Sequence, residues 1–219
     1  MTRYLQTMTA AGLIGLFGLA STSAEATTAQ APAGTAVSVG AAISGESTNF
    51  KLVSENEAGE EGTTGSVECA SGKLTGVVTE NGGSEVAINI TGEVFSECKG
   101  PMGSTVDTTT NATAASPWRL RIQQPNEKGE ITAHYSPAPG STLQSIEQIQ
   151  VLGFDVATCV YSGTTMQLTG SVGSNIFHIA GTRQRTRQSG NPLFCAKYLT
   201  LSGQGALKSS GNALVVDMT

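Results

Sequence analysis

The stretch between Cys69 and Cys98 constrains the fold of this chain more than any other part of the sequence. Two runs rich in β-branched residues flank the turn sequence N-G-G at 81–83, which is typical of a β-hairpin. A four-residue loop over 82–85 would pair Asn81 with Val86 and place the two cysteines opposite each other. A register shifted by two residues would leave them diagonal on the same face. Both registers allow a disulfide, so the stretch predicts a hairpin closed by a covalent bond.

The composition predicts an all-β chain. Of 219 residues 27 are Gly and only 5% are aromatic, and Thr and Ser are abundant, which favours strands and turns over helices. Alternation supports this, because Trp118, Leu120 and Ile122 share one face of a half-buried strand. We predict a single antiparallel β-sandwich or flattened barrel of roughly a dozen strands, stapled by two disulfides.

A longer apolar pattern begins at Leu143 and changes phase over 151–153. A β-bulge shifts the faces of a strand in this way, so the pattern predicts one long strand with a bulge.

The first residues have the pattern of an export signal. Arg3 precedes the apolar run Ala10–Ala20, and Ala24 and Ala26 each complete a small-x-small cleavage pattern. The run is too short to cross a bilayer as a helix, and the sequence has no second apolar segment, so no membrane span is predicted.

The predicted organisation has three parts: a signal peptide over 1–26, a flexible linker over 27–36 and a single β domain over 37–219. Only 13% of residues are charged and the net charge is −5, which argues against nucleic acid or an anionic membrane as a partner. We expect a secreted protein, outside the cell or at its surface, with the periplasm as the alternative.

Four cysteines in an exported chain indicate two disulfides. Three connectivities are possible, and we favour Cys69–Cys98 and Cys159–Cys195, each worth about 3–4 kcal/mol under the chain-entropy model. The chain has no C-x-x-C pair and only two histidines, so no metal site is predicted.

Two charged stretches are interpreted as solvated loops. The acidic stretch at 55–62 contains none of the chain's three Asp residues, so we prefer a loop to a calcium site. The basic stretch R-Q-R-T-R at 183–187 has no aromatic neighbour, which argues against nucleic acid; an anion or polysaccharide contact is the alternative to a solvated loop.

No catalytic pattern is visible in the sequence. It has no G-x-S-x-G elbow, no phosphate-binding or dinucleotide-binding glycine motif and no distinct pair of carboxylates. We predict a protein that is not an enzyme, with no cofactor and no catalytic, cofactor-binding or metal-ligating residue. The predicted site residues are the disulfide cysteines Cys69, Cys98, Cys159 and Cys195.

Several short motifs follow one another in a distinctive order: V-E-C with L-T-G (67–76), I-T-G-E-V-F-S-E-C-K-G-P (90–101), S-P-W-R-L (116–120), C-V-Y-S-G with L-T-G (159–170), and L-F-C with L-S-G (193–203). This order resembles the exported bacterial family of PraB-type "protein activators of alkane oxidation". The resemblance implies an all-β exported protein without an assigned active site, linked to growth on hydrophobic substrates or to the cell surface and biofilm matrix. It carries over only the cysteines and Trp118, which we interpret as structural. The two charged stretches depart from the family pattern.

Three functional hypotheses follow. The first is a secreted, non-enzymatic surface or matrix protein whose partners are hydrophobic substrates, polysaccharide or other surface proteins. The second is a fimbria-like structural or adhesive subunit, in which a strand completes the sheet of a neighbour. The third is a polysaccharide-active enzyme.

The export hypothesis predicts where the exported chain begins. Signal peptidase cleaves after small-x-small patterns, so protein recovered outside the cytoplasm should start just after Ala24 or Ala26. N-terminal sequencing of that material tests the prediction, and material from the cytoplasm is the uncleaved control. Exported protein that retains Met1 would contradict it.

Overall fold

A computed structural model of the chain describes residues 26–57 and 60–218. Apart from Ala26, the predicted signal peptide lies outside the described residues. In the described part the chain forms fourteen strands and two 3-10 helices: β1 (Thr27–Gln30), β2 (Ala42–Glu57), β3 (Glu60–Glu80), β4 (Glu85–Lys99), η1 (Pro101–Gly103), β5 (Thr105–Thr110), β6 (Trp118–Gln123), β7 (Glu130–Ser136), β8 (Leu143–Val151), β9 (Phe154–Gly163), β10 (Met166–Ser171), β11 (Ile176–Gly190), η2 (Pro192–Phe194), β12 (Tyr198–Ser209), β13 (Asn212–Ala213) and β14 (Val215–Met218). Across these residues, no helix is long and apolar enough to cross a membrane.

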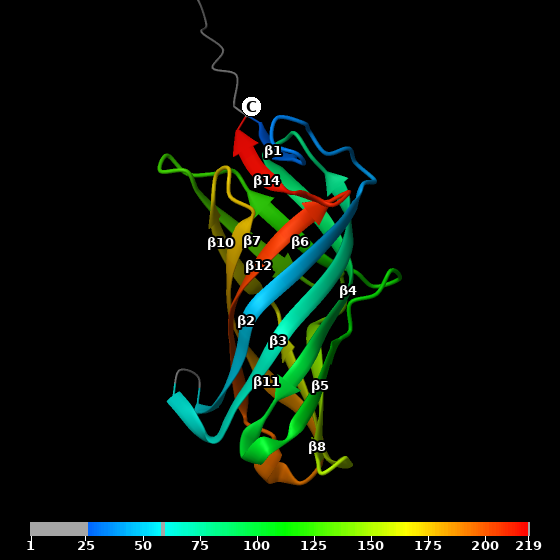
Figure 1. The fold of residues 1–219 in the computed structure, drawn as a ribbon, viewed down its shortest axis with the longest axis vertical. Helices are drawn as coiled ribbons and strands as arrows, with labels where there is room; N and C mark the ends of the chain where they lie inside the picture. Colours follow the sequence, from blue (N-terminus) through cyan, green and yellow to red (C-terminus); the bar gives the residue numbers. More distant parts are fainter. Residues whose placement is uncertain (1–25, 58–59, 219) are drawn as a thin grey trace, which may run out of the picture.

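Twelve of the strands form one antiparallel sheet that closes on itself (Figure 1). The long strands β2, β3, β4, β11 and β12 run along the molecule, and the pairing of β11 with β12 closes the ring. The first half of β4 pairs with β6 and its second half with β5. Likewise β11 pairs first with β10 and then with β9. The ring therefore contains eight strands at either level, and the predicted all-β fold is confirmed in its barrel form.

Of the two registers that the sequence allowed for the central hairpin, the structure has the one that places the cysteines opposite each other. Cys69 lies directly opposite Cys98 and is bonded to it, and the second disulfide joins Cys159 to Cys195. Between the turn and the disulfide the register shifts twice, with one extra residue on each strand, so the two shifts cancel. The extra residues are Thr91 and Thr79, and their hydroxyls donate to the carbonyls of Thr75 and Ala87. Threonine thus supplies polar contacts where the ladder is interrupted.

The prediction of a flexible linker is wrong for Thr27–Gln30. These residues form β1, which is buried and pairs antiparallel with β14 as a small separate sheet at one end of the barrel (Figure 1). The residues T-T-A-Q carry little apolar signal, so their composition suggested disorder. Pairing with the last strand orders them, and the two ends of the described chain together cap the barrel.

Asn81 holds this cap in place. Its side-chain oxygen accepts from the Ala29 N–H at 2.7 Å, and its amide donates to the carbonyls of Ala29 at 3.0 Å and Val37 at 2.7 Å. One side chain from the N-G-G turn therefore fastens both β1 and the segment that follows it.

Two further sequence interpretations change. At 152–153, where a bulge was predicted, the chain makes a two-residue turn whose φ values of 52° and 82° are those of a type I′ hairpin. The bulge lies just beyond the turn on β9, because the β8–β9 register shifts between Ile149 and Gln150 and leaves Val156 as the extra residue. A turn of this type usually contains Asn-Gly, so the apolar Leu-Gly pair concealed it. The acidic stretch at 55–62 forms the end of the long β2–β3 hairpin, because β2 extends to Glu57 and β3 begins at Glu60; residues 58–59 lie outside the described part.

The barrel interior is packed with apolar and aromatic side chains. Trp118 is 1% exposed, as expected for a core anchor, and its ring meets Tyr135 edge-on at 6.1 Å. Phe50 and Phe95 stack with their centroids 4.2 Å apart. Aromatic pairs of this kind add about 0.5–1.5 kcal/mol beyond their buried area.

Replacing Asn81 with alanine should release the cap. The loss of three partly buried hydrogen bonds should lower the free energy of unfolding by about 2–3 kcal/mol, at roughly 1 kcal/mol per bond. Limited proteolysis should then cut the segment 31–41 faster, and thermal unfolding should begin at a lower temperature. Asn212→Ala, at an exposed site on β13, is the matched control. An Asn81→Ala protein as stable and as resistant as the control would contradict this account.

Candidate functional site

A set of polar side chains points into the barrel where the strand pairing changes. This polar layer comprises Glu93 on β4, Thr108 on β5, Ser145 and Glu147 on β8, and Arg183 on β11. Glu93 lies between the β4 residues that pair with β6 and those that pair with β5, and Arg183 lies at the corresponding change on β11. Glu147 is 1% exposed and Arg183 is 3% exposed. The layer therefore marks the waist between the two levels of the ring.

Arg183 corrects the interpretation of the basic stretch. R-Q-R-T-R is not a solvated loop, because all five residues lie within β11 and Arg183 points inward. Its guanidinium carbon lies 5.1 Å from the centroid of the Trp118 ring, and one terminal N–H approaches the Met166 sulfur at 3.9 Å. The guanidinium thus packs on aromatic and thioether groups, which attract a cation.

The two buried carboxyl groups titrate far above their usual range. Burial raises the pKa of Glu147 to about 8 and that of Glu93 to about 7, and Arg183 partly opposes both shifts. Burial also lowers the pKa of Arg183, against the opposing effect of the two glutamates. Near neutral pH the layer therefore holds the Arg183 cation together with at least one protonated carboxyl group.

Four atoms of the layer have no hydrogen-bond partner in the protein: Thr108 Oγ1, Ser145 Oγ, Glu147 Oε1 and Arg183 Nε. Thr108 and Glu147 face each other across the β5–β8 ladder, and Ser145 lies two residues from Glu147 on the same strand. Each unpaired buried polar group costs roughly 1–3 kcal/mol. The layer therefore lowers the free energy of unfolding.

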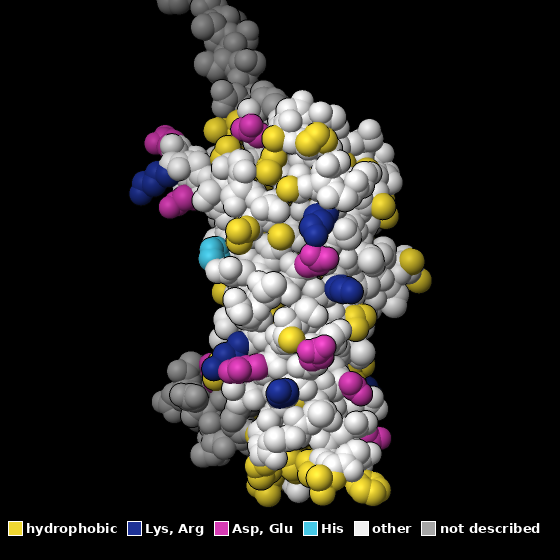
Figure 2. Space-filling view, viewed as in Figure 1, with side chains coloured by type: hydrophobic (Ala, Val, Ile, Leu, Met, Phe, Trp, Pro, Cys, Tyr) yellow, Lys and Arg dark blue, Asp and Glu magenta, His cyan; other side chains and the backbone are white. Residues whose placement is uncertain are grey.

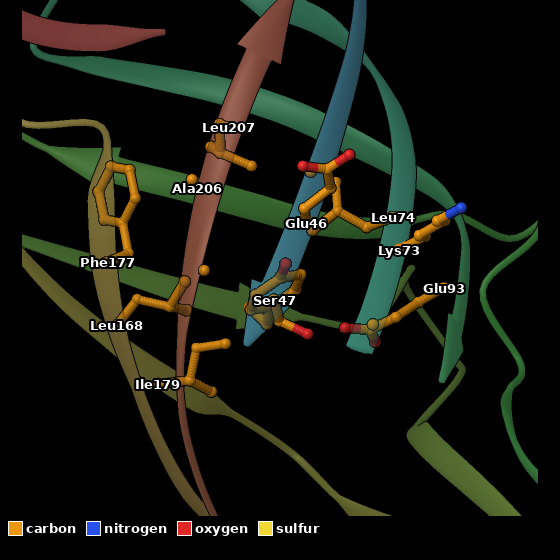
Figure 3. Close-up of a pocket in the computed structure, with 14 residues that line it drawn as sticks. Glu46, Ser47, Lys73, Leu74, Glu93, Leu168, Phe177, Ile179, Ala206 and Leu207 are labelled. Carbon is orange, nitrogen blue, oxygen red and sulfur yellow. The ribbon is translucent and has the colours of Figure 1, made fainter. Parts of the chain in front are cut away.

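A small cavity adjoins the layer (Figure 3). Leu168, Phe177, Ile179 and Leu207 line one side, while Ser47 and Glu93 approach from the other. Glu93 is half-buried, and its carboxyl group points towards this cavity. The volume is about 30 Å³, room for one or two water molecules but not for an organic ligand.

The wall beside the cavity is built from small residues. Gly205, Ser47 and Gly72 are direct neighbours across β12, β2 and β3. A Cβ atom on Gly72 would lie 2.8 Å from the Phe95 ring and still closer to Ser47 Oγ, so glycine lets the interior pack against the wall. Small eight-stranded barrels either fill their interior with side chains or hold one ligand, and this barrel is filled.

The opposite end from the cap carries exposed apolar side chains (Figure 2). This apolar tip consists of Met102 in η1, Leu152 and Phe154 at the β8–β9 turn, and Leu193 in η2, which are 75%, 94%, 74% and 70% exposed. The three turns are neighbours, because β5 pairs with β8 and the start of β9 pairs with the end of β11. Together they form the lower end of the molecule in Figures 1 and 2.

Two residues of the tip adopt an unusual backbone conformation. Met102 and Leu152 have φ values of 57° and 52°, in the left-handed region that bulky apolar residues seldom occupy. The other non-glycine residues with positive φ in the described chain are Asn49, Glu97 and Ser210, all of them polar. Glycine or asparagine would fit both positions with less strain and better solubility. These two side chains therefore satisfy neither the usual preference of the left-handed region nor that of an exposed turn.

The predicted disulfides brace this tip. Cys98 lies near the end of β4, shortly before η1, and is bonded to β3; Cys195 directly follows η2 and is bonded to β9. Arg185 donates to the Cys195 carbonyl and adds a further tie beside η2. The cysteines are structural staples, as the sequence predicted, and two tip turns are anchored next to them.

Sequence reasoning identified the cysteines but missed both the polar layer and the tip. The sequence did contain one signal for the layer. In the alternating pattern of β8, Ser145 and Glu147 fall on the same inward face as Leu143 and Ile149. Within the described residues no group of His, Cys, Asp and Glu could hold a metal ion. Comparison with protein-family models, curated proteins and solved structures gives no match to this chain.

The polar layer should make the protein more stable as pH falls from 8 to 5. A carboxyl with a raised pKa binds its proton more tightly in the folded state, so its contribution is complete below the unfolded value of 4.5 and is lost as pH rises through 7 to 8. Replacing Glu147 with Gln should remove much of this dependence and raise the stability at pH 8 by on the order of 2 kcal/mol. Urea unfolding at several pH values measures both effects.

Glu127→Gln, on the exposed β6–β7 turn, is the control and should leave the wild-type pH profile unchanged. An identical pH profile for Glu147→Gln and wild type would contradict the account of the layer.

Proposed function

We propose that this is an exported, non-enzymatic protein of the cell surface or extracellular matrix that attaches to hydrophobic material through its apolar tip. The observation that carries the proposal is the tip itself: four large apolar side chains exposed on three neighbouring turns, two of them in strained backbone conformations. Isolated exposed apolar residues are ordinary, whereas a contiguous group marks an interaction site.

The energy available at the tip fits reversible attachment. Full burial of a Leu, Met or Phe side chain contributes about 1.5–3 kcal/mol, and the tip offers four such side chains. Association costs at least about 4 kcal/mol in lost freedom of motion, which consumes much of that gain. A single molecule would therefore bind weakly, and many copies on one surface would hold firmly.

The disulfides and the resemblance support the compartment and the partner class. Two disulfides indicate an oxidising environment outside the cytoplasm. The predicted signal peptide supports the more specific proposal that the protein is secreted. The resemblance to the PraB-type proteins supports hydrophobic substrates as its binding partners. Secretion and hydrophobic partners are both part of the proposal.

The alternative functions receive less support. Each strand of the large sheet except β13 has neighbours on both sides, so a fimbria-like exchange of strands would have to use β13 or the small β1–β14 sheet. Glu93 and Glu147 face the interior, where a polysaccharide could not reach them without opening the sheet. The tip is the surface on which the proposed function depends.

Replacing Leu152 with Asn should separate binding from stability. We expect retention on an octyl-bearing surface to fall about tenfold, because roughly 1.4–2 kcal/mol of apolar burial is lost. The same change should leave stability equal or raise it slightly, because Asn suits the type I′ turn. Surface plasmon resonance on octyl-coated chips and thermal unfolding measure the two effects.

Val39→Asn is the matched control, because Val39 is also exposed, at 62%, but lies near the cap. It should bind like the wild-type protein. Equal loss of binding in both variants, or no loss in Leu152→Asn, would contradict the proposal.

A further inference from the structure

If the apolar tip is the attachment site, its shape and charge narrow the partner further. We infer that the tip enters the acyl-chain region of a neutral, zwitterionic lipid layer, and that the barrel stands end-on upon it. This inference rests on the proposed function but is more specific, because hydrocarbon, solid and protein surfaces would also satisfy the proposal above.

The shape of the tip favours a soft partner. Its four side chains project from convex turns, with Leu152 the most exposed at 94%. Side chains on separate protruding turns can all be buried at once only if the partner deforms around them. A fluid lipid layer does so, and the apolar face of an amphipathic helix is known to be buried in this way where headgroups meet acyl chains. Met102, with a flexible unbranched side chain, suits such an irregular environment.

The charge of the tip favours a neutral layer. Asp155 is the one ionisable residue in the turn sequences G-P-M-G-S (100–104), V-L-G-F-D (151–155) and G-N-P-L-F-C (190–195). Lys99 and Lys197 flank these turns together with Arg185, whose guanidinium donates to the Cys195 carbonyl; Glu97 and Asp155 lie among them, and the whole chain carries a net charge of −5. Proteins that bind anionic lipids do so through clusters of Lys and Arg beside the inserted side chains. The tip has no such cluster, so acidic lipids should not strengthen its binding.

The arrangement of the turns sets the orientation. The three turns lie at one end of an elongated barrel, and the β1–β14 cap lies at the other (Figure 1). All four side chains can reach a planar layer together only if the long axis stands steeply on it. The cap and the two ends of the described chain, Ala26 and Met218, then face away from the lipid.

A second copy of the chain fits the tip less well. Stable protein interfaces bury about 1,200–2,000 Å² with complementary shapes on both sides. Four projecting side chains on convex turns offer a smaller area and no matching groove. The disulfides beside η1 and η2 limit any rearrangement that would create one.

Vesicle flotation tests the inference with the mature chain. Wild-type protein should float with vesicles of pure phosphatidylcholine, and the addition of one fifth phosphatidylglycerol should not increase the bound fraction. Leu152→Asn combined with Phe154→Asn should reduce binding at least tenfold, while Val39→Asn should bind like wild type. Binding that depends on phosphatidylglycerol would overturn the neutral-lipid inference.

Tryptophan placed at either end tests the orientation. In Phe154→Trp, brominated phosphatidylcholine should quench emission beyond the background of Trp118, and the emission should shift to shorter wavelength. In Ile176→Trp, near the cap, neither change should occur. Quenching of the residue at 176 to the same degree would overturn the end-on orientation.

The results also separate this inference from the proposed function. Binding to an octyl surface without binding to phosphatidylcholine vesicles would overturn the lipid inference and leave the proposed function standing. Binding to neither would overturn both. Size-exclusion chromatography that shows a dimer abolished by Leu152→Asn, with no vesicle binding, would identify a second copy as the occupant and overturn the lipid inference.

Discussion

The hydrogen-bonded pairing of β11 with β12 is the contact on which the rest of the structure depends. It joins Ile176–Gln184 to Tyr198–Ala206 and turns an open twelve-stranded sheet into a ring. Closure gives every long strand an enclosed face, and it removes the open edges through which sheets join other chains. The pairing of β4 with β6 completes the arrangement, in which two sets of shorter strands share β4 and β11, one above the other. The waist between those sets is where Glu93 and Arg183 lie, so the position of the polar layer follows from the topology.

The structure concentrates its unfavourable features at two places. In the waist, buried charges and unpaired polar atoms oppose folding, and burial moves the pKa values of Glu93 and Glu147 into the neutral range. At the tip, exposed apolar side chains and left-handed backbone oppose both solubility and folding. The disulfides lie at the tip end, where each binds a chain segment beside a strained or exposed turn to a neighbouring strand. A staple worth about 3 kcal/mol offsets several such local costs.

The sequence predicted what depends on local pattern and missed what depends on closure. Alternation predicted the all-β class, and the N-G-G turn narrowed the Cys69–Cys98 hairpin to two registers, of which the structure has the directly opposed one. The disulfide pairing that we favoured among three connectivities is also observed. The strand β1 was missed because its order comes from pairing with β14 at the far end of the chain, and its own composition suggests disorder. Arg183 was taken for a solvated residue because a cation is rarely buried without a partner close in sequence; its aromatic and acidic neighbours come from other strands. The turn at Leu152 was hidden because a leucine stands where asparagine is expected.

That last mismatch carries information about function that a correct prediction would not. A residue whose side chain fits its backbone conformation and its exposure to water needs no further explanation. Leu152 fits neither, because it is apolar, fully exposed and in the left-handed region. The turn would form at least as well with Asn-Gly, and this mismatch is the observation on which the proposed attachment site rests. The same reasoning applies to Met102, on a different turn that lies beside the first only because the ring is closed. Because the barrel is held by its ladders and staples, the residues at the tip can change without loss of the fold. In the proposed function, stability and contact are therefore carried by different residues, and the choice of surface rests with a few side chains on rigid turns.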